Sequence, residues 1–161
     1  MQSKPILLSI LFSAIILALS MENIDLYNLP FKASYDSLDK ETQRQVTCLA
    51  DNIYFEAAHE PLDGKKAVAF VTINRLQTGN YAKDICGVVY QKNVFMEKVV
   101  CQFSWACDAV HRNRPINKEA YNESYEVAKK VLLEGFRLSI LKDALFYHAA
   151  YVNPRWPLDK I

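Results

Sequence analysis

The chain has 161 residues, of which 51% are hydrophobic, 12% are aromatic and 23% are charged. This length suits one compact domain, and the apolar content excludes an intrinsically disordered chain. The 19 basic and 18 acidic residues nearly cancel, to a formal net charge of +1. Because no basic patch stands out, the sequence predicts no nucleic-acid partner.

Residues 1–20 have the pattern of a secretory signal. Lys4 is followed by an apolar run over residues 6–19, which is shorter than the roughly 20 residues of a membrane span and typical of a signal peptide. Ala18-Leu19-Ser20 would supply the small residues of a cleavage site. We expect a signal peptide or N-terminal anchor, and an exported protein (periplasm, cell envelope or secreted) that contacts the membrane only through this segment. A buried core helix is the alternative.

Four cysteines follow, namely Cys48, Cys86, Cys101 and Cys107. An even number behind an export signal predicts disulfides. Three pairings are possible and the sequence does not choose among them; we favour Cys48 with Cys86 and Cys101 with Cys107. A zinc site made of all four is disfavoured because no Cys-x-x-Cys pair is present. In a reducing compartment they would instead be buried thiols.

The first predicted helix runs from an N-cap at Ser37 to about His59. Its apolar residues recur at the spacing of one helix face; they are Val46, Leu49, Ala50, Ile53, Tyr54 and Ala57. Glu56 lies at the edge of this stripe. Partial burial of a carboxyl group favours its protonated form, so Glu56 is a candidate general acid. The alternative is an ordinary Glu in the last turn of an amphipathic helix.

The second predicted helix begins after a corner at Glu60-Pro61. A residue that precedes proline is disfavoured in helical geometry, so the chain should turn there. Asp63 is expected to cap the helix, which runs over residues 64–78, and Gly79 is expected to end it.

The rest of the chain predicts a mostly helical α+β fold with a small sheet. The expected elements are a short helix at 84–91, extended structure at 94–105, a turn at 107–115, an amphipathic helix at 117–134 capped by Asn117 and ended by Gly135, a short strand at 143–149 and a final loop with two prolines. The chain would then divide into the N-terminal segment 1–20, an arm or linker at 21–36 and one domain at 37–161.

Four stretches form a specific combination of motifs. They are CLADNIYFEAAHEPLDGKKAVAFVTINR (48–75), ICGVVYQ (85–91), CQFSWACD (101–108) and ALFYHAAYVNPRW (144–156). In order and spacing they resemble the cell wall hydrolase family of the spore-cortex-lytic (SleB-like) type. The resemblance covers about residues 45–158. It implies a fold like that of lysozymes and lytic transglycosylases, with the small sheet beside a saccharide cleft, and it makes 37–161 the catalytic domain.

The resemblance also implies an activity. The enzyme would act on peptidoglycan glycan strands and cleave the β-1,4 bond between N-acetylmuramic acid and N-acetylglucosamine, as a lytic transglycosylase or a muramidase. The family's catalytic acid is the first Glu of its Tyr-x-Glu-Ala-Arg-Gly-Glu motif. YFEAAHE at 54–60 matches that motif, so the role carries to Glu56 as general acid and base. Ala58 and His59 depart from the usual Arg and Gly, so the family's substrate contacts at this point do not carry over, and His59 must either adopt the positive φ that Gly tolerates or let the turn change.

The expected substrate-binding residues are polar and aromatic side chains of the matched stretches: Glu60, Gln102, Ser104, Trp105, Tyr147, His148 and Tyr151. Aromatic rings can stack on sugars, and amide or hydroxyl groups can hydrogen-bond N-acetyl groups. Most of the aromatic residues are expected to be core residues and some to line the cleft. Glu60 and Asp108 are the candidates for a second carboxylate. We expect a monomer, with no metal and no cofactor.

Two other functions compete with this hypothesis. A zinc amidase that cuts the lactyl-peptide bond would need His59, His111 and His148 to converge on a metal, and no His-Glu-x-x-His motif is present. A peptidoglycan-binding module without turnover would fit the two departures beside Glu56.

Overall fold

The computed structural model describes residues 37–148. The elements are α2 (Lys40–Ala57), α3 (Leu62–Gln77), α4 (Ile85–Val89), β1 (Lys92–Phe95), β2 (Lys98–Cys101), the 3₁₀ turn η3 (Ser104–Cys107), α5 (Ala109–Arg112), α6 (Lys118–Leu132) and the 3₁₀ turn η4 (Ser139–Leu141). The expected N-terminal signal, the arm at 21–36 and Tyr151 lie outside the described residues. Over the described residues, helices dominate beside one two-stranded antiparallel sheet, which confirms the α+β prediction. Among the described helices, none has the length and apolar character needed to cross a bilayer.

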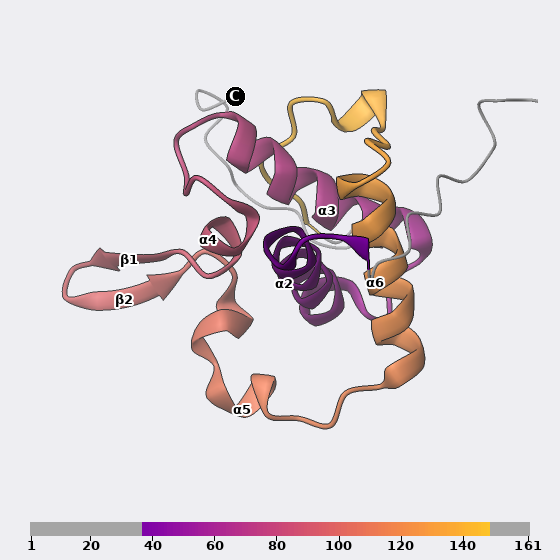
Figure 1. Cartoon of the computed structure of the whole chain (residues 1–161). Coiled ribbons are helices and arrows are strands. Elements are labelled where there is room, and N and C mark those ends of the chain that lie inside the picture. The colour runs from indigo at the N-terminus through magenta and orange to yellow at the C-terminus, as the bar shows by residue number, and fades with distance from the viewer. Residues whose placement is uncertain (1–36, 149–161) are drawn as a thin grey trace, which may run out of the picture. The chain divides into compact units, whose positions relative to one another are not determined.

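Helix α2 is the centre of the core. It packs against α3, α4 and α6 (Figure 1). The residues of its predicted apolar stripe that are fully buried are Val46, Leu49, Ala50 and Ile53. Facing them are Phe70 of α3 and Val131 of α6, which are also buried. The 3.6-residue periodicity therefore identified the buried face of α2 correctly.

Both predicted N-caps in the first half of the chain were wrong. Asp39, not Ser37, caps α2, because its carboxylate accepts hydrogen bonds from Thr42 N (2.9 Å) and Thr42 Oγ1 (2.6 Å). Helix α3 begins directly after Pro61, and Asp63 lies in its first turn. A proline suits a helix start because its missing N–H would have no partner there, and a carboxylate in the first turn favours the positive end of the helix dipole.

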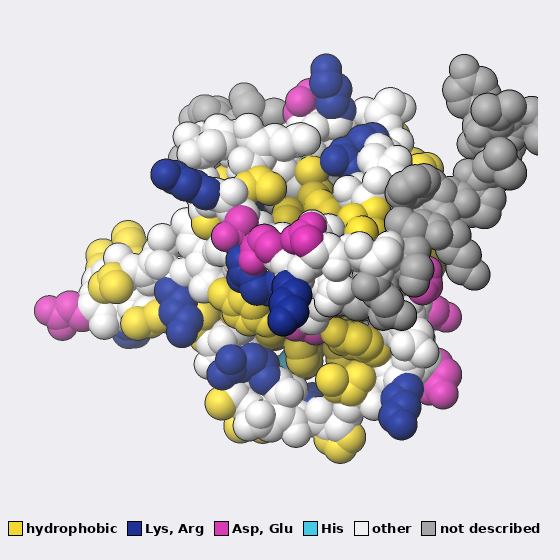
Figure 2. Space-filling model, viewed as in Figure 1, with side chains coloured by type: hydrophobic (Ala, Val, Ile, Leu, Met, Phe, Trp, Pro, Cys, Tyr) yellow, Lys and Arg dark blue, Asp and Glu magenta, His cyan; other side chains and the backbone are white. Residues whose placement is uncertain are grey.

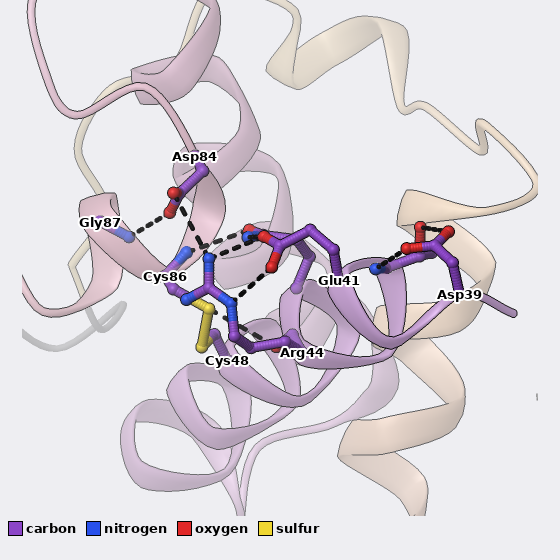
Figure 3. A network of polar contacts seen from close by, with 9 residues as sticks. Asp39, Glu41, Arg44, Cys48, Asp84, Cys86 and Gly87 are labelled. Atoms are coloured by element: carbon purple, nitrogen blue, oxygen red, sulfur yellow. Dashed lines mark hydrogen bonds and ion pairs between the residues drawn. A yellow bond between two sulfur atoms is a disulfide. The ribbon is translucent and has the colours of Figure 1, made fainter.

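Two disulfides join the elements in the favoured pairing. Cys48–Cys86 links α2 to α4, and Cys101–Cys107 links β2 to η3. Beside the first, Arg44 of α2 reaches Asp84 at 3.5 Å, while the other Asp84 oxygen accepts from Gly87 N and caps α4 (Figure 3). The short α4 is thus fixed to α2 by a covalent bond and by a polar contact.

Residues 94–101 of the stretch predicted as extended belong to a hairpin of β1 and β2 that projects away from the helices (Figure 1), whereas Ser104 and Trp105, also predicted as extended, lie in η3. The two-residue turn of the hairpin, Met96-Glu97, has positive φ at both positions (47° and 62°), as a hairpin turn with the right twist requires. Neither residue is a usual choice there, so the sequence carried no hairpin signal. Hydrophobic side chains are exposed on the hairpin (Figure 2), with Phe95 at 65% and Met96 at 81% exposure.

The second half of the chain confirms two helix ends and corrects two predictions. Asn117 caps α6 through Ala120 N (2.9 Å), and Gly135 follows the helix with φ of 66°. The expected turn at 107–115 contains the short helix α5. The strand expected at 143–149 is absent, since residues 144–148 have no regular structure within the described part of the chain. Backbone carbonyls near this segment accept hydrogen bonds from α3 side chains instead of a strand partner.

Removing the Cys48–Cys86 disulfide should cost more stability than removing Cys101–Cys107. The two disulfides span 38 and 6 residues, and the entropy that a crosslink removes from the unfolded chain grows with loop length. We expect the Cys48→Ala/Cys86→Ala variant to lose about 4 kcal/mol of unfolding free energy, and the Cys101→Ala/Cys107→Ala variant about 2 kcal/mol. Urea denaturation measures both. An equal or larger loss in the second variant would contradict this order.

Candidate active site

Glu56 lies in the last turn of α2 and is half-buried. Its Oε2 accepts a 2.6 Å hydrogen bond from the hydroxyl of Tyr147. Burial raises the pKa of Tyr147 well above its ordinary value, and the negative charge of Glu56 is the second cause of this rise. The phenol therefore keeps its proton at any working pH. Glu56 consequently has a permanent hydrogen-bond donor on one carboxylate oxygen and one oxygen left for other partners.

The loop that carries Tyr147 is fixed by the last turns of α3. Asn74 Nδ2 donates to the carbonyl oxygens of Leu141 (2.8 Å) and Ala144 (2.9 Å). Arg75 Nε donates to the carbonyl oxygen of Leu145 (3.0 Å). Three side-chain hydrogen bonds thus replace the missing strand pairing. They determine where Tyr147 meets Glu56, which is 91 positions earlier in the chain.

Arg75 brings a buried positive charge close to the Glu56–Tyr147 pair. Its side chain is only 5% exposed and lies over the rings of Tyr81, Phe103 and Phe146, with centroids 5.0–5.7 Å away. Burial lowers the pKa of Arg75, and this effect is opposed by its attraction to neighbours that include Glu56. Within the described residues Nη1 is buried without a hydrogen-bond partner. Sequence reasoning missed Arg75; its only signal was a charged residue inside an apolar helix pattern.

A pocket of about 270 Å³ opens where α2 ends. Its lining comes from two segments, the end of α2 with the following corner and the stretch around the end of α5; the residues are Tyr54, Phe55, Glu56, Ala57, Ala58, His59, Glu60, His111, Arg114 and Pro115. The pocket holds two carboxylates, two imidazoles and one guanidinium. It can therefore offer both proton donors and charged anchors to a ligand.

Glu60 is held at the rim of this pocket by its backbone. Lys65 is buried, and its Nζ donates to the Glu60 carbonyl oxygen (3.0 Å) and pairs with Glu123 of α6 (3.0 Å). Gly64 approaches so closely that an added Cβ would meet the Glu60 Cβ at 2.9 Å. The corner between α2 and α3 therefore has a fixed path, while the Glu60 side chain itself is exposed.

Trp105 was predicted to face substrate, but the structure places it in the core. It is 4% exposed and stacks on Phe55, with ring centroids 4.4 Å apart. Its Nε1 donates to Asn52 Oδ1, and Asn52 Nδ2 donates to Thr72 Oγ1, both at 3.0 Å. Each polar atom in this buried chain has a partner, which is the condition for placing them there. Trp105 thus supports the helix turn that carries Glu56 and offers no free face to a sugar.

The other predicted substrate-binding residues within the described part of the chain lie outside the pocket lining, apart from Glu60. Ser104 is exposed at the start of η3, and Gln102 is half-buried after β2. Neither belongs to the lining of the described pocket. His148 is exposed, next to Tyr147. The structure therefore brings Glu56 together with Glu60 in one pocket and with Tyr147 through a hydrogen bond, and it leaves Gln102 and Ser104 outside that pocket.

Two further carboxylates have structural partners. Asp108, a candidate second carboxylate, caps α5 by accepting from His111 N (2.9 Å), which lowers its pKa. Asp51 of α2 accepts hydrogen bonds from the hydroxyls of Tyr121 (2.8 Å) and Tyr90 (3.2 Å). Burial raises the pKa of Asp51 despite these bonds. Within the described residues, no group of three or more His, Cys, Asp or Glu side chains is arranged to hold a metal.

Residues 59–160 match the family described as Cell Wall Hydrolase. The chain belongs to this family. The match includes Glu60 and Tyr147 but begins three residues after Glu56. A spore cortex-lytic enzyme of Oceanobacillus iheyensis is 33% identical over 54 residues, which are 34% of this cell wall hydrolase and 20% of that relative. The aligned part thus spans about a fifth of the relative's length. No solved structure matches the chain.

Asp51 should make the stability of this cell wall hydrolase depend on pH. Because burial raises its pKa, the folded state binds this proton more tightly than the unfolded chain. The resulting stabilisation is present at low pH and is lost as pH rises through the raised pKa. Relative to Asp51→Asn, the parent protein should gain unfolding free energy as pH falls from 7 to about 4. Urea midpoints at a series of pH values test this, and a constant difference would refute it.

Proposed function

We propose that this cell wall hydrolase degrades peptidoglycan by cleaving the β-1,4 bond between N-acetylmuramic acid and N-acetylglucosamine, with Glu56 as general acid. The observation that carries the proposal is the position of Glu56, half-buried in the pocket wall and hydrogen-bonded to Tyr147 at 2.6 Å. Family membership supports the substrate, and the name of the aligned relative agrees with it.

The hydrogen bond from Tyr147 gives the two carboxylate oxygens of Glu56 different roles. Tyr147 occupies Oε2 as a donor, so a proton on the acid belongs on Oε1. From there it passes to the glycosidic oxygen as the bond from that oxygen to C1 of the muramyl ring breaks. Tyr147 then stabilises the carboxylate that is left. The tyrosine is thus a positioning residue for Glu56.

A lytic transglycosylase route accounts best for a single well-held acid. The C6 hydroxyl of the muramyl residue attacks C1, and Glu56, now ionised, takes the proton of that hydroxyl. The product is a 1,6-anhydro sugar, and no second carboxylate is needed. Glu60 lines the same pocket with an exposed side chain, whereas Asp108 is occupied as a helix cap. Hydrolysis with Glu60 positioning a water is the second route.

The broader predictions stay proposals. Two disulfides support a protein that matures in an oxidising compartment, as export would require. The mostly helical fold with one small sheet is compatible with a lysozyme-like architecture. The monomeric state stays a prediction.

The decisive experiment is a digest of purified peptidoglycan with product masses as the readout. The full chain should release 1,6-anhydro-muramyl products, and Glu56→Gln should lower the rate by at least about 100-fold, because general acid catalysis typically contributes that much. Glu134→Gln removes an exposed carboxylate elsewhere and should leave the rate unchanged. Reducing-end products would indicate hydrolysis, and free stem peptides an amidase. Binding without any product would favour the non-catalytic module.

Tyr147→Phe should lower kcat about tenfold and leave KM nearly unchanged. The variant keeps the ring but loses the donor to Glu56, and a charge-assisted hydrogen bond contributes roughly 1.5 kcal/mol or more. Tyr90→Phe is the matched control, because its hydroxyl bonds to Asp51 and not to Glu56. Steady-state kinetics on soluble glycan strands give both constants. A rise in KM with unchanged kcat would assign Tyr147 to substrate binding instead.

A further inference from the structure

The pocket at the end of α2 contains charges that the proposed acid chemistry does not use. Glu56 and Glu60 come from α2 and its corner, while His111 and Arg114 come from the segment that ends α5 and follows it. A general acid acting on a neutral glycosidic bond needs no arginine beside it. The guanidinium is therefore available for another part of the ligand.

Contacts with side chains of α2 hold the segment that contains Arg114 at both ends. Arg114 N donates to the carbonyl oxygen of His111 (3.3 Å), and the His111 ring packs edge-on against Phe55 of α2 at 5.6 Å. Beyond Pro115, Asn117 N donates to the hydroxyl of Tyr54, also on α2 (3.0 Å). Arg114 thus lies between two attachments to the helix that carries Glu56. Its backbone position relative to the pocket is fixed by the fold.

The guanidinium of Arg114 has no ion pair within residues 37–148, which contain both pocket carboxylates. Arg114 contributes, after the His111 contacts, to the lowered pKa of Asp108, and the Asp108 carboxylate already accepts a hydrogen bond from His111 N. Ala58 also lines the pocket and leaves room because its side chain is small. An arginine held at a pocket without a carboxylate of its own suits a carboxylate on a ligand, which it can bind through two parallel hydrogen bonds.

We propose that Arg114 binds a carboxylate carried by the muramyl residue of the substrate and so selects acidic glycan strands over neutral ones. This inference rests on the proposed function. Because Glu56 would protonate the oxygen on C1 of the muramyl ring, the substrate presents to this pocket the ring whose C3 carries the lactyl group. Two sources supply the carboxylate: the free lactyl group of a strand without peptides, or an acidic residue of the stem peptide.

The test measures binding and does not require turnover. The full chain with Glu56→Gln is titrated calorimetrically with the disaccharide N-acetylglucosaminyl-N-acetylmuramic acid and with the same disaccharide as its lactyl carboxamide. Adding Arg114→Gln should weaken binding of the acid about tenfold, the usual value of one charge-assisted contact, and change the carboxamide by less than about twofold. Arg112→Gln, a charge change on α5 outside the pocket lining, is the matched control and should change neither.

A third ligand distinguishes the source of the carboxylate. If the disaccharide with its stem peptide loses affinity in Arg114→Gln and the free acid does not, the peptide supplies the carboxylate. Equal weakening of acid and carboxamide, no change in any of the three ligands, or no binding of any of them would overturn the proposal. If the Arg114 effect is seen but the parent chain cleaves no glycan, the binding site stands and the proposed chemistry fails. Circular dichroism of each variant checks folding.

Discussion

Burial of one face of α2 is the constraint on which the structure depends. The face packs against three other helices, and one of its buried residues, Cys48, is crosslinked to α4. A helix buried this completely cannot rotate or slide without exposing apolar surface. The residues at the edge of the same stripe therefore have fixed positions. Glu56 is one of them, so the packing of the core also fixes the position of the candidate acid.

Polar groups inside the core refine this placement. Asn52 holds Trp105 and Thr72 in a fully bonded chain, Lys65 ties the corner after α2 to α6, and Arg75 anchors the loop that carries Tyr147. Each of these polar groups would be costly to bury without a partner. Each makes at least one hydrogen bond, and that bond requires a particular orientation of the side chain. Apolar packing sets the distances between helices, and these hydrogen bonds set the orientation of the loops. Catalytic geometry requires both.

The two arginines near the site differ in burial. Arg75 is buried under aromatic rings near the Glu56–Tyr147 pair, where its field acts through low-dielectric surroundings. Arg114 is exposed at the pocket and meets solvent or ligand. A buried cation contributes to the electrostatic field at the acid, whereas an exposed cation attracts ligands of opposite charge. The two arginines are thus suited to different tasks, although both were ordinary basic residues in the sequence.

Local information in the sequence determined the helices other than α5, the buried stripe of α2, the cap at Asn117 and the glycine that ends α6, because each depends on residues within one or two turns. It also singled out Glu56 from a short motif. Only the tertiary structure decided which helix residues begin α2 and α3, that Trp105 is a core residue, and that residues 144–148 form no strand. It alone showed that Tyr147, Arg75 and Arg114 come close to the end of α2. Such contacts join residues tens of positions apart, and their formation depends on the packing of whole helices, which no local pattern encodes.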